Sequence, residues 1–290
     1  MTGFFNTLIE YFRDPFVSGV IIKALVVGIP VALCASLLGV TLVLKRLSMI
    51  GDGLSHVGFG ALAIAAALNF GASANSTATL LISLPIVIVA AFFLLRLSQN
   101  SKVNGDAAIA LVSTGAIAVG YLLFNVTGSG EPADICSSLF GKSTIINIDN
   151  VIVPISLALS IIVLTLFILS FNRIFSITFD ENFASATGVK TKRYNLLIAL
   201  LTAVTIVLGM QLVGAIMISG LIVFPTITAM RVCKSFKSVV VTSGIISVVC
   251  FVIGFFAAAV YDFPTGPSVI TVNIIVYGAF TVASILMRKK

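Results

Sequence analysis

Long apolar runs separated by short polar segments occupy most of this chain. A transmembrane helix needs about 20 mostly apolar residues, and runs near that length recur from one end of the sequence to the other. The pattern predicts nine spanning helices, with eight as the alternative because 195–230 could hold one full span and one broken span. The predicted runs are Phe16–Leu44, Gly53–Phe70, Ala78–Leu95, Ala107–Phe124, Val151–Phe171, Asn195–Gly209, Leu212–Met230, Val239–Val260 and Ser268–Met287. The chain is therefore predicted to be an all-α, polytopic membrane protein.

The runs follow one another without a long polar interruption, which predicts a single transmembrane domain over 16–290. Residues 1–15 carry Glu10, Arg13 and Asp14, and they lack the basic start, short apolar core and small-residue cleavage site of a signal peptide. We therefore expect a retained, amphipathic N-terminal lead-in.

Composition excludes several function classes. Hydrophobic residues make up 59% of the chain and charged residues 9%, with a mean hydropathy of +1.20. A soluble domain usually carries about 25% charged residues, so this chain has too few polar groups to cover a soluble surface. It also offers no long polar stretch from which a soluble catalytic domain could be built. The net charge of +7 sits in short clusters between apolar runs and does not indicate nucleic-acid binding.

The distribution of basic residues predicts the orientation in the membrane. The segments 45–46, 96–102, 172–193, 231–237 and 288–290 hold 14 of the 17 Lys and Arg residues. Cytoplasmic loops are enriched in Lys and Arg, and nine spans place all five segments on one side. We therefore expect the N-terminus outside and the C-terminus in the cytoplasm.

The inner connection over 172–194 contains a short helical pattern. Asp180 and Glu181 precede Phe183, Ala184 and Thr187, and Gly188 is a natural helix stop. Such a helix can be a lipid-interface element, or it can dock a soluble partner. The pattern alone leaves both interpretations open.

Motifs for catalysis are weak. The segment CSSLFGKS at 136–143 ends like a phosphate-binding P-loop, but Cys136 stands where the first glycine is needed, and the predicted topology puts it outside. The chain has a single histidine, His56, so a two-histidine zinc protease motif is impossible. Ser55 is its sequence neighbour, and adjacent residues on a helix face different directions. We expect no enzyme activity in this chain.

One polar stretch stands out at the start of the second predicted span. Asp52 and His56 are four residues apart, so a helix places both on one face. Gly51, Gly53, Gly58 and Gly60 surround them and permit close approach of another helix or a ligand. A carboxylate near the bilayer is costly and persists where it faces a cavity, a partner or an ion. Carboxylate and imidazole suit Mn²⁺, Zn²⁺ or Fe²⁺.

Two ligands are too few for a closed metal site. A symmetric homodimer would bring two copies of Asp52 and two of His56 together on its axis. The alternative interpretation is structural, with Asp52 capping the second helix and His56 packed with a satisfied hydrogen bond.

Five phrases in this order resemble one known family, the membrane permeases of manganese/zinc/iron ABC importers that work with cluster A-I metal-binding lipoproteins. The most specific phrase is the one that contains Asp52 and His56, and together the phrases extend over nearly the whole chain. They are LLGVTLVLKRLSMIGDGLSHVGFGALAIA at 37–65, LFGKSTI at 139–145, FDENFASATGV at 179–189, QLVGAIMISGLIVFPTITA at 211–229 and DFPTGPSVI at 262–270.

The resemblance implies a type II ABC importer-like permease in the bacterial cytoplasmic membrane. Its partners would be a second copy of the chain, two cytosolic ATP-binding subunits, and an extracellular metal-binding lipoprotein or periplasmic binding protein. Asp52 and His56 match the family's metal-coordinating pair, and Glu181, Ala184 and Gly188 fall in its ATPase-coupling segment. The metal, Mn²⁺ or Zn²⁺ and alternatively Fe²⁺, is then cargo and no cofactor is bound permanently; ATP binds only to the partner subunit.

Two alternatives stay open from the sequence. A siderophore or cobalamin permease of the related ABC class would favour a wide apolar path over an Asp/His pair. An ion-coupled secondary transporter would need no ATPase. Among metals, the same ligand set suits several ions, so the residues do not select one.

Overall fold

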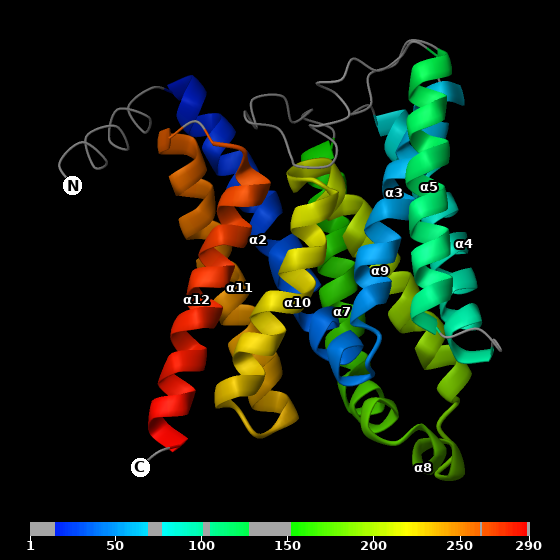
Figure 1. Ribbon diagram of the computed structural model, residues 1–290, viewed down its shortest axis with the longest axis vertical. Coiled ribbons are helices and arrows are strands. Elements are labelled where there is room, and N and C mark those ends of the chain that lie inside the picture. The colour runs from blue at the N-terminus through cyan, green and yellow to red at the C-terminus, as the bar shows by residue number, and fades with distance from the viewer. Residues whose placement is uncertain (1–14, 69–76, 101–104, 128–151, 262, 289–290) are drawn as a thin grey trace.

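The computed structural model describes residues 15–68, 77–100, 105–127, 152–261 and 263–288. Every regular element in these ranges is a helix, and the long helices run up and down an elongated bundle (Figure 1). This confirms the predicted all-α class. The lead-in up to residue 14 and the segments at 136–143 and 139–145 lie outside the described residues.

Nine long helices and one short helix occupy the described ranges, and each long helix coincides for most of its length with one predicted run. Gly214, with a φ of 93°, separates two of them, so 195–230 holds two helices as the nine-span prediction requires. The helices are α2 (Pro15–Leu44), α3 (Ser48–Leu68), α4 (Thr77–Asn100), α5 (Gly105–Thr127), α7 (Ile152–Phe179), the short α8 (Glu181–Ala186), α9 (Thr191–Val213), α10 (Ala215–Val232), α11 (Phe236–Tyr261) and α12 (Thr265–Arg288).

Seven of these helices are long and apolar enough, over the residues described, to cross a membrane by length and composition alone. The two others are α4, whose apolar part is Leu81–Leu94, and α3, which carries Asp52 and His56. Helix α3 contacts α4, α5, α9 and α10. Polar residues at membrane depth usually face protein or a cavity and not lipid.

The inner connection is shorter than the sequence pattern predicts. Helix α7 continues to Phe179 and does not stop at Phe171, and α9 begins at Thr191 and not at Asn195. The polar residues that indicated a loop form their hydrogen bonds inside the helix, because the Ser176 and Thr178 hydroxyls donate to backbone carbonyls one turn back. Only 180–190 remains between the two spans.

The basic connections lie at one end of the bundle (Figure 1). This end holds the turn between α2 and α3 with Lys45 and Arg46, the α8 segment, the turn between α10 and α11, and the last turn of α12. A shared end is what the predicted cytoplasmic assignment requires.

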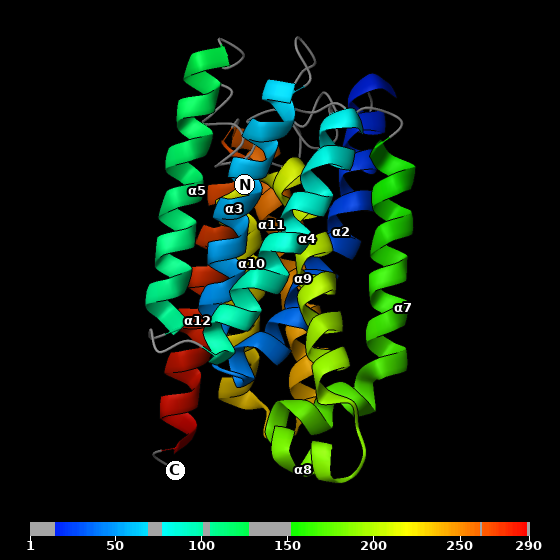
Figure 2. The ribbon, with the colours of Figure 1, turned by 90° about the vertical axis from the view of Figure 1, so that its right-hand side faces the viewer.

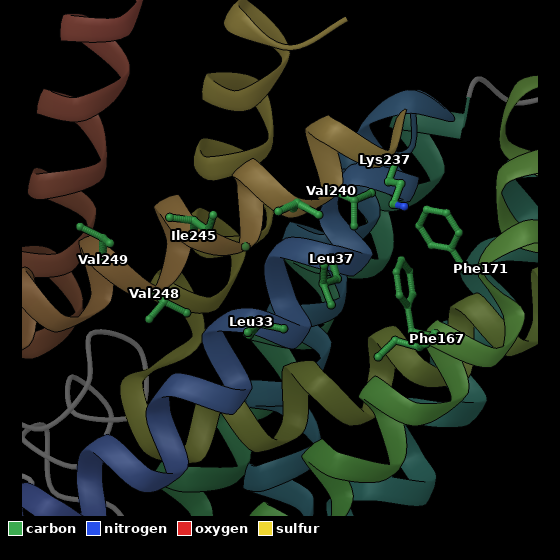
Figure 3. Close-up of a pocket in the computed structure, with 12 residues that line it drawn as sticks. Leu33, Leu37, Phe167, Phe171, Lys237, Val240, Ile245, Val248 and Val249 are labelled. Atoms are coloured by element: carbon green, nitrogen blue, oxygen red, sulfur yellow. The ribbon is translucent and has the colours of Figure 1, made fainter. Parts of the chain in front are cut away.

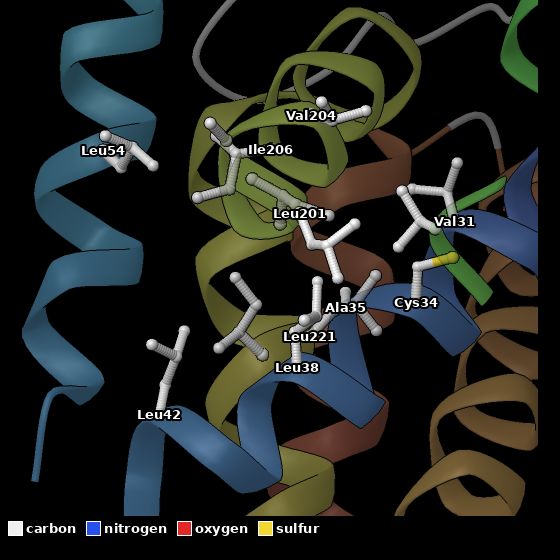
Figure 4. Close-up of a cluster of buried hydrophobic side chains, with 14 of the residues drawn as sticks. Val31, Cys34, Ala35, Leu38, Leu42, Leu54, Leu201, Val204, Ile206 and Leu221 are labelled. Carbon is white, nitrogen blue, oxygen red and sulfur yellow. The ribbon is translucent and has the colours of Figure 1, made fainter. Parts of the chain in front are cut away.

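The core lies where α2, α3, α9 and α10 meet (Figure 4). Lipid tails are as apolar as leucine, so close packing and not water exclusion holds such helices together. A Cβ added at Gly39 of α2 would collide with the backbone carbonyl oxygen of Ile222 of α10, which means that these two backbones touch. The centre of the bundle is therefore tightly packed, and α3 contributes Leu54 to it. Labelled members of this cluster are Val31, Cys34, Ala35, Leu38, Leu42, Leu54, Leu201, Val204, Ile206 and Leu221.

Helices α5 and α12 form the flanks of the bundle and expose most of their surface (Figures 1 and 2). Their exposed side chains include Leu111 and Leu122 on α5 and Ile275 and Leu286 on α12. Such faces suit contact with lipid or with another membrane-spanning chain.

Candidate functional site

Helix α3 positions Asp52 and His56 on one face. The chain leaves α2 through a tight turn in which Arg46 has a φ of 59° and the Leu47 amide donates to the Leu42 carbonyl. Because α3 already begins at Ser48, Asp52 lies in the second helical turn. Asp52 is therefore not the cap of this helix, and the structural interpretation of its role is wrong in that respect.

The open face of α3 coincides with the predicted pair. Between Ile50 and Ala65, every residue is buried except Asp52, His56 and Ile64. The Asp52 side chain is 50% exposed and that of His56 20%. Between residues 50 and 65, a solute that reaches this helix would therefore meet the polar side chains of this pair.

The two side chains face each other without being bonded. His56 Nε2 lies 3.7 Å from Asp52 Oδ2, which is too long for a hydrogen bond. Two ligands that each lie about 2.1 Å from a tetrahedral metal are about 3.4 Å apart. The observed separation is close to this value, so both atoms can ligate one cation after a small adjustment.

The second ring nitrogen of His56 is unusual. Nδ1 is buried and has no hydrogen-bond partner among the described residues. A metal-ligating histidine usually donates its other N–H to an acceptor that fixes the ring. Packing alone therefore holds the imidazole, which is a weaker support than a tight resident metal site normally has.

Asp52 and His56 alone are too few ligands for a closed metal site. Over the described part of the chain, no group of three or more His, Cys, Asp and Glu side chains could hold a metal ion. If the pair binds a metal, further ligands must come from another copy, from water or from elsewhere, and the predicted doubling by dimer symmetry would supply them.

The glycines beside the pair serve helix packing. A Cβ at Gly53 would lie 2.5 Å from Ile109 Cγ2, and one at Gly60 would lie 2.8 Å from the Ala116 carbonyl oxygen, both on α5. A Cβ at Gly58 would lie 2.8 Å from Met210 Cε on α9. Of the two predicted uses of these glycines, close approach of another helix is confirmed. The packing on α5 and α9 leaves the side of α3 with Asp52 and His56 uncovered.

Ser55 does not form a nucleophile with His56. Its side chain is buried, and its hydroxyl donates a 2.7 Å hydrogen bond to the Asp52 carbonyl oxygen. The geometry supports the expectation that this pair performs no Ser/His hydrolysis.

The short helix α8 matches its sequence signals. Asp180 caps it by accepting a 2.9 Å hydrogen bond from the Phe183 amide. Gly188 ends it with a φ of 86°, a conformation that favours glycine. Ala184 is fully buried, while Phe183 is 65% exposed. Helix α8 lies below the lower ends of α7 and α9 (Figure 2).

The Glu181 side chain is 45% exposed, and its carboxylate contacts two residues of the bundle that the sequence pattern did not single out. Its Oε1 accepts a 2.8 Å hydrogen bond from Asn195 Nδ2, and its Oε2 lies 3.7 Å from Lys45 Nζ. Lys45 Nζ also donates a 2.6 Å hydrogen bond to Asn195 Oδ1. Burial lowers the pKa of Lys45, while the nearby Glu181 carboxylate raises it. In the sequence, Lys45 contributed only to the basic charge of the segment 45–46, and no sequence motif connects it with Asn195.

The described residues also form an open apolar pocket of about 600 Å³ between α2, α7 and α11 (Figure 3). Leu37, Phe167 and Val240 line it, and Lys237 stands at one end. No residue of α3 takes part in it. This pocket is therefore separate from the Asp52–His56 pair and offers no metal ligands.

Comparison with known proteins supports one family over nearly the whole chain. The profile of the ABC 3 transport family matches residues 18–285. The chain is also similar to the manganese transport system membrane protein MntC of Halalkalibacterium halodurans, with 26% identity across 94% of this chain and 87% of that protein. It is 28% identical to the high-affinity zinc uptake system membrane protein ZnuB of Haemophilus influenzae, across 87% of this chain and 92% of that protein.

A solved structure has the same fold. PsaBC from Streptococcus pneumoniae, in complex with Fab, contains a chain that superposes with a TM-score of 0.80 and 23% identity, covering 95% of both chains. This likeness confirms the arrangement of helices described above.

Proposed function

The chain belongs to the ABC 3 transport family, and from this premise we propose that it is the permease subunit of an importer for a divalent transition metal. The cargo would be Mn²⁺ or Zn²⁺, with Fe²⁺ as the alternative, and ATP hydrolysis on a separate subunit would drive its import. The observation that carries the proposal is the Asp52–His56 pair, whose facing atoms lie 3.7 Å apart and whose members are the only polar residues of α3 between residues 50 and 65 that are not buried. Similarity to membrane proteins named for manganese and zinc transport agrees with this ligand chemistry.

Asp52 and His56 hold the metal transiently in this mechanism. The carboxylate balances the charge of the cation, and the imidazole supplies a nitrogen ligand that manganese, zinc and iron all accept. A transport site must bind its cargo and then release it, so a fully ligated, rigid site would be unsuitable. Two ligands per copy, with an imidazole held by packing alone, suit a site that lets its cargo go.

The functional unit would be a homodimer in the bacterial cytoplasmic membrane. A two-fold axis beside the open face of α3 would join two carboxylates and two imidazoles into one site. The N-terminus would lie outside and the C-terminus in the cytoplasm, which places the basic end of the bundle on the cytoplasmic side. An extracellular lipoprotein or periplasmic binding protein would deliver the metal to the opposite end.

Two cytosolic ATP-binding subunits would dock on the basic end, and α8 is their contact. Its exposed Phe183 provides an apolar anchor, Ala184 holds the helix against the bundle, and Gly188 closes it. Glu181 bonds through its two carboxylate oxygens to Asn195 and Lys45, so its role in coupling would be to tie α8 to the bundle.

Uptake measurements on the assembled transporter test the metal site. Cells that express the chain with its ATPase and binding protein should lose accumulation of Mn²⁺ or Zn²⁺ at limiting concentration when the chain carries Asp52→Asn or His56→Ala. Asp106→Asn is the matched control, because Asp106 is an exposed carboxylate at the start of α5. Expression and ATPase co-purification should be unchanged in all three variants.

The outcomes separate the alternatives. Normal metal uptake by both site variants would make the pair structural and overturn the proposal. Uptake of a siderophore or cobalamin in place of free metal would favour the chelate-carrying permease. Transport that persists without an ATP-binding subunit would indicate an ion-coupled secondary transporter.

A further inference from the structure

Three polar side chains from three separate segments meet at the basic end of the bundle. Lys45 follows the last residue of α2, Glu181 opens α8, and Asn195 lies in the second turn of α9. The amide of Asn195 joins the other two, because its oxygen accepts from Lys45 Nζ at 2.6 Å and its nitrogen donates to Glu181 Oε1 at 2.8 Å. Lys45 and Glu181 also face each other directly at 3.7 Å. These three residues form a closed triangle, which we call the Lys45 triad.

Two of the three side chains in the triad, Lys45 and Asn195, are almost completely shielded from solvent. The Lys45 side chain is 10% exposed and Asn195 is 5% exposed, whereas the Glu181 side chain is 45% exposed. A buried ammonium is tolerated when it is paired and hydrogen-bonded, and removing one partner leaves a costly unpaired group. Breaking the contacts of Lys45 with Glu181 and Asn195 would therefore be costly. Glu181, on α8, is the most exposed of the three residues.

The triad gives α8 an attachment that its backbone contacts lack. The backbone of α8 contacts mainly α7, which precedes it, and α9, which follows it. Ala184 is its single buried residue. Through Glu181 and Lys45, α8 also reaches the turn that begins α3, seven residues before Asp52. A displacement of α8 thus acts on the helix that carries the candidate metal pair, although the two helices are far apart in sequence.

We propose that the Lys45 triad transmits movement of α8 to α3 and thereby couples ATP hydrolysis to the opening of the Asp52–His56 site. Lys45 and Asn195 are then positioning residues, which touch neither the metal nor the ATPase. This inference rests on the proposed function, because it assigns to α8 the contact with the ATP-binding subunit.

Variants of the complete transporter, with ATPase and binding protein present, test the link. Lys45→Met keeps the apolar stem and removes the charge, and Glu181→Gln is a milder change at the exposed member. Each should keep the complex assembled and leave ATP hydrolysis active, while metal uptake per ATP hydrolysed falls at least tenfold. Lys192→Met is the matched control, since Lys192 is an exposed lysine at the start of α9, and it should behave like the unmodified protein.

A charge exchange distinguishes coupling from simple stabilisation. The Asn195 amide can rotate to offer its oxygen or its nitrogen to either partner. The double variant Lys45→Glu/Glu181→Lys should therefore recover most of the uptake that each single reversal loses. Recovery of uptake per ATP is a result that a loss of folding alone would not produce.

Each outcome has a defined meaning. Uncoupled hydrolysis with rescue by charge exchange supports the inference. Unchanged uptake per ATP in Lys45→Met and Glu181→Gln overturns it, and so does dissociation of the ATPase, which would make the triad part of a docking surface. Asp52→Asn separates the metal-site hypothesis from the coupling hypothesis. Normal uptake by that variant would refute the metal site, whereas the triad is judged by uptake per ATP hydrolysed in its own variants.

Discussion

His56 Nε2 and Asp52 Oδ2 lie 3.7 Å apart across one turn of α3, facing each other without a hydrogen bond. A cation between them would satisfy both groups at once, whereas either group alone gains nothing from the other beyond weak attraction. The distance between the two ligand atoms should therefore affect transport independently of the charge.

Asp52→Glu tests this dependence on distance. The variant keeps the negative charge but carries the carboxylate one methylene further from the helix, which disturbs the shared ligand geometry. We expect uptake at limiting metal to fall by about tenfold, equivalent to about 1.4 kcal/mol of binding free energy. Uptake would then lie between that of the unmodified protein and that of Asp52→Asn. Equal uptake by Asp52→Glu and the unmodified protein would show that only charge matters.

Gly60→Ala should disturb the packing that holds α3. The added Cβ would lie 2.8 Å from the Ala116 carbonyl oxygen, a backbone atom that cannot rotate away. We expect a loss of about 1–3 kcal/mol, measured as a lower thermal unfolding temperature in detergent. Gly115→Ala on α5 is the control, because nothing lies within 4 Å of its added Cβ. Similar unfolding temperatures for the two variants would argue against backbone contact between α3 and α5.

Gly188 should tolerate asparagine better than valine. Its φ of 86° is strained for residues with a side chain, and valine is β-branched, whereas asparagine enters this region more readily. Gly188→Val should destabilise the end of α8 by about 1–2 kcal/mol and weaken co-purification of the ATPase. Gly188→Asn should retain most of the ATPase co-purification. Full co-purification with Gly188→Val would mean that the end of α8 does not contribute to docking.

Cysteine labelling tests the predicted orientation. In a background without native cysteines, Lys192→Cys should react with an impermeant reagent only from the cytoplasm, and Phe263→Cys only from outside. Both positions are exposed, and they lie at the starts of α9 and α12 on opposite ends of the bundle. Reaction of position 192 with the impermeant reagent in intact cells would contradict the predicted orientation.

The positions of helices were accessible from the sequence because apolar runs and cap signals are local. Asp180 and Gly188 bracket α8 as the pattern predicts, and the spacing of Asp52 and His56 fixes their common face. The end of α7 was missed because Ser176 and Thr178 satisfy their hydroxyls within the helix, which composition does not reveal. The bond between Lys45 and Asn195 joins residues 150 positions apart, so only the packed bundle discloses it.

Mixed dimers provide the test of a site shared between two copies. If both copies contribute Asp52 and His56 to one metal site, a dimer with one Asp52→Asn copy lacks a required carboxylate and should not transport. When unmodified and Asp52→Asn chains are produced in equal amounts and pair at random, about one quarter of the dimers carry two intact copies. Uptake should then fall to about one quarter of the unmodified level, whereas independent sites in each copy would leave about one half. When uptake is measured at several mixing ratios, it should be proportional to the square of the fraction of unmodified chains. A linear dependence would place a complete transport site within each copy, which would require ligands beyond the pair that α3 presents.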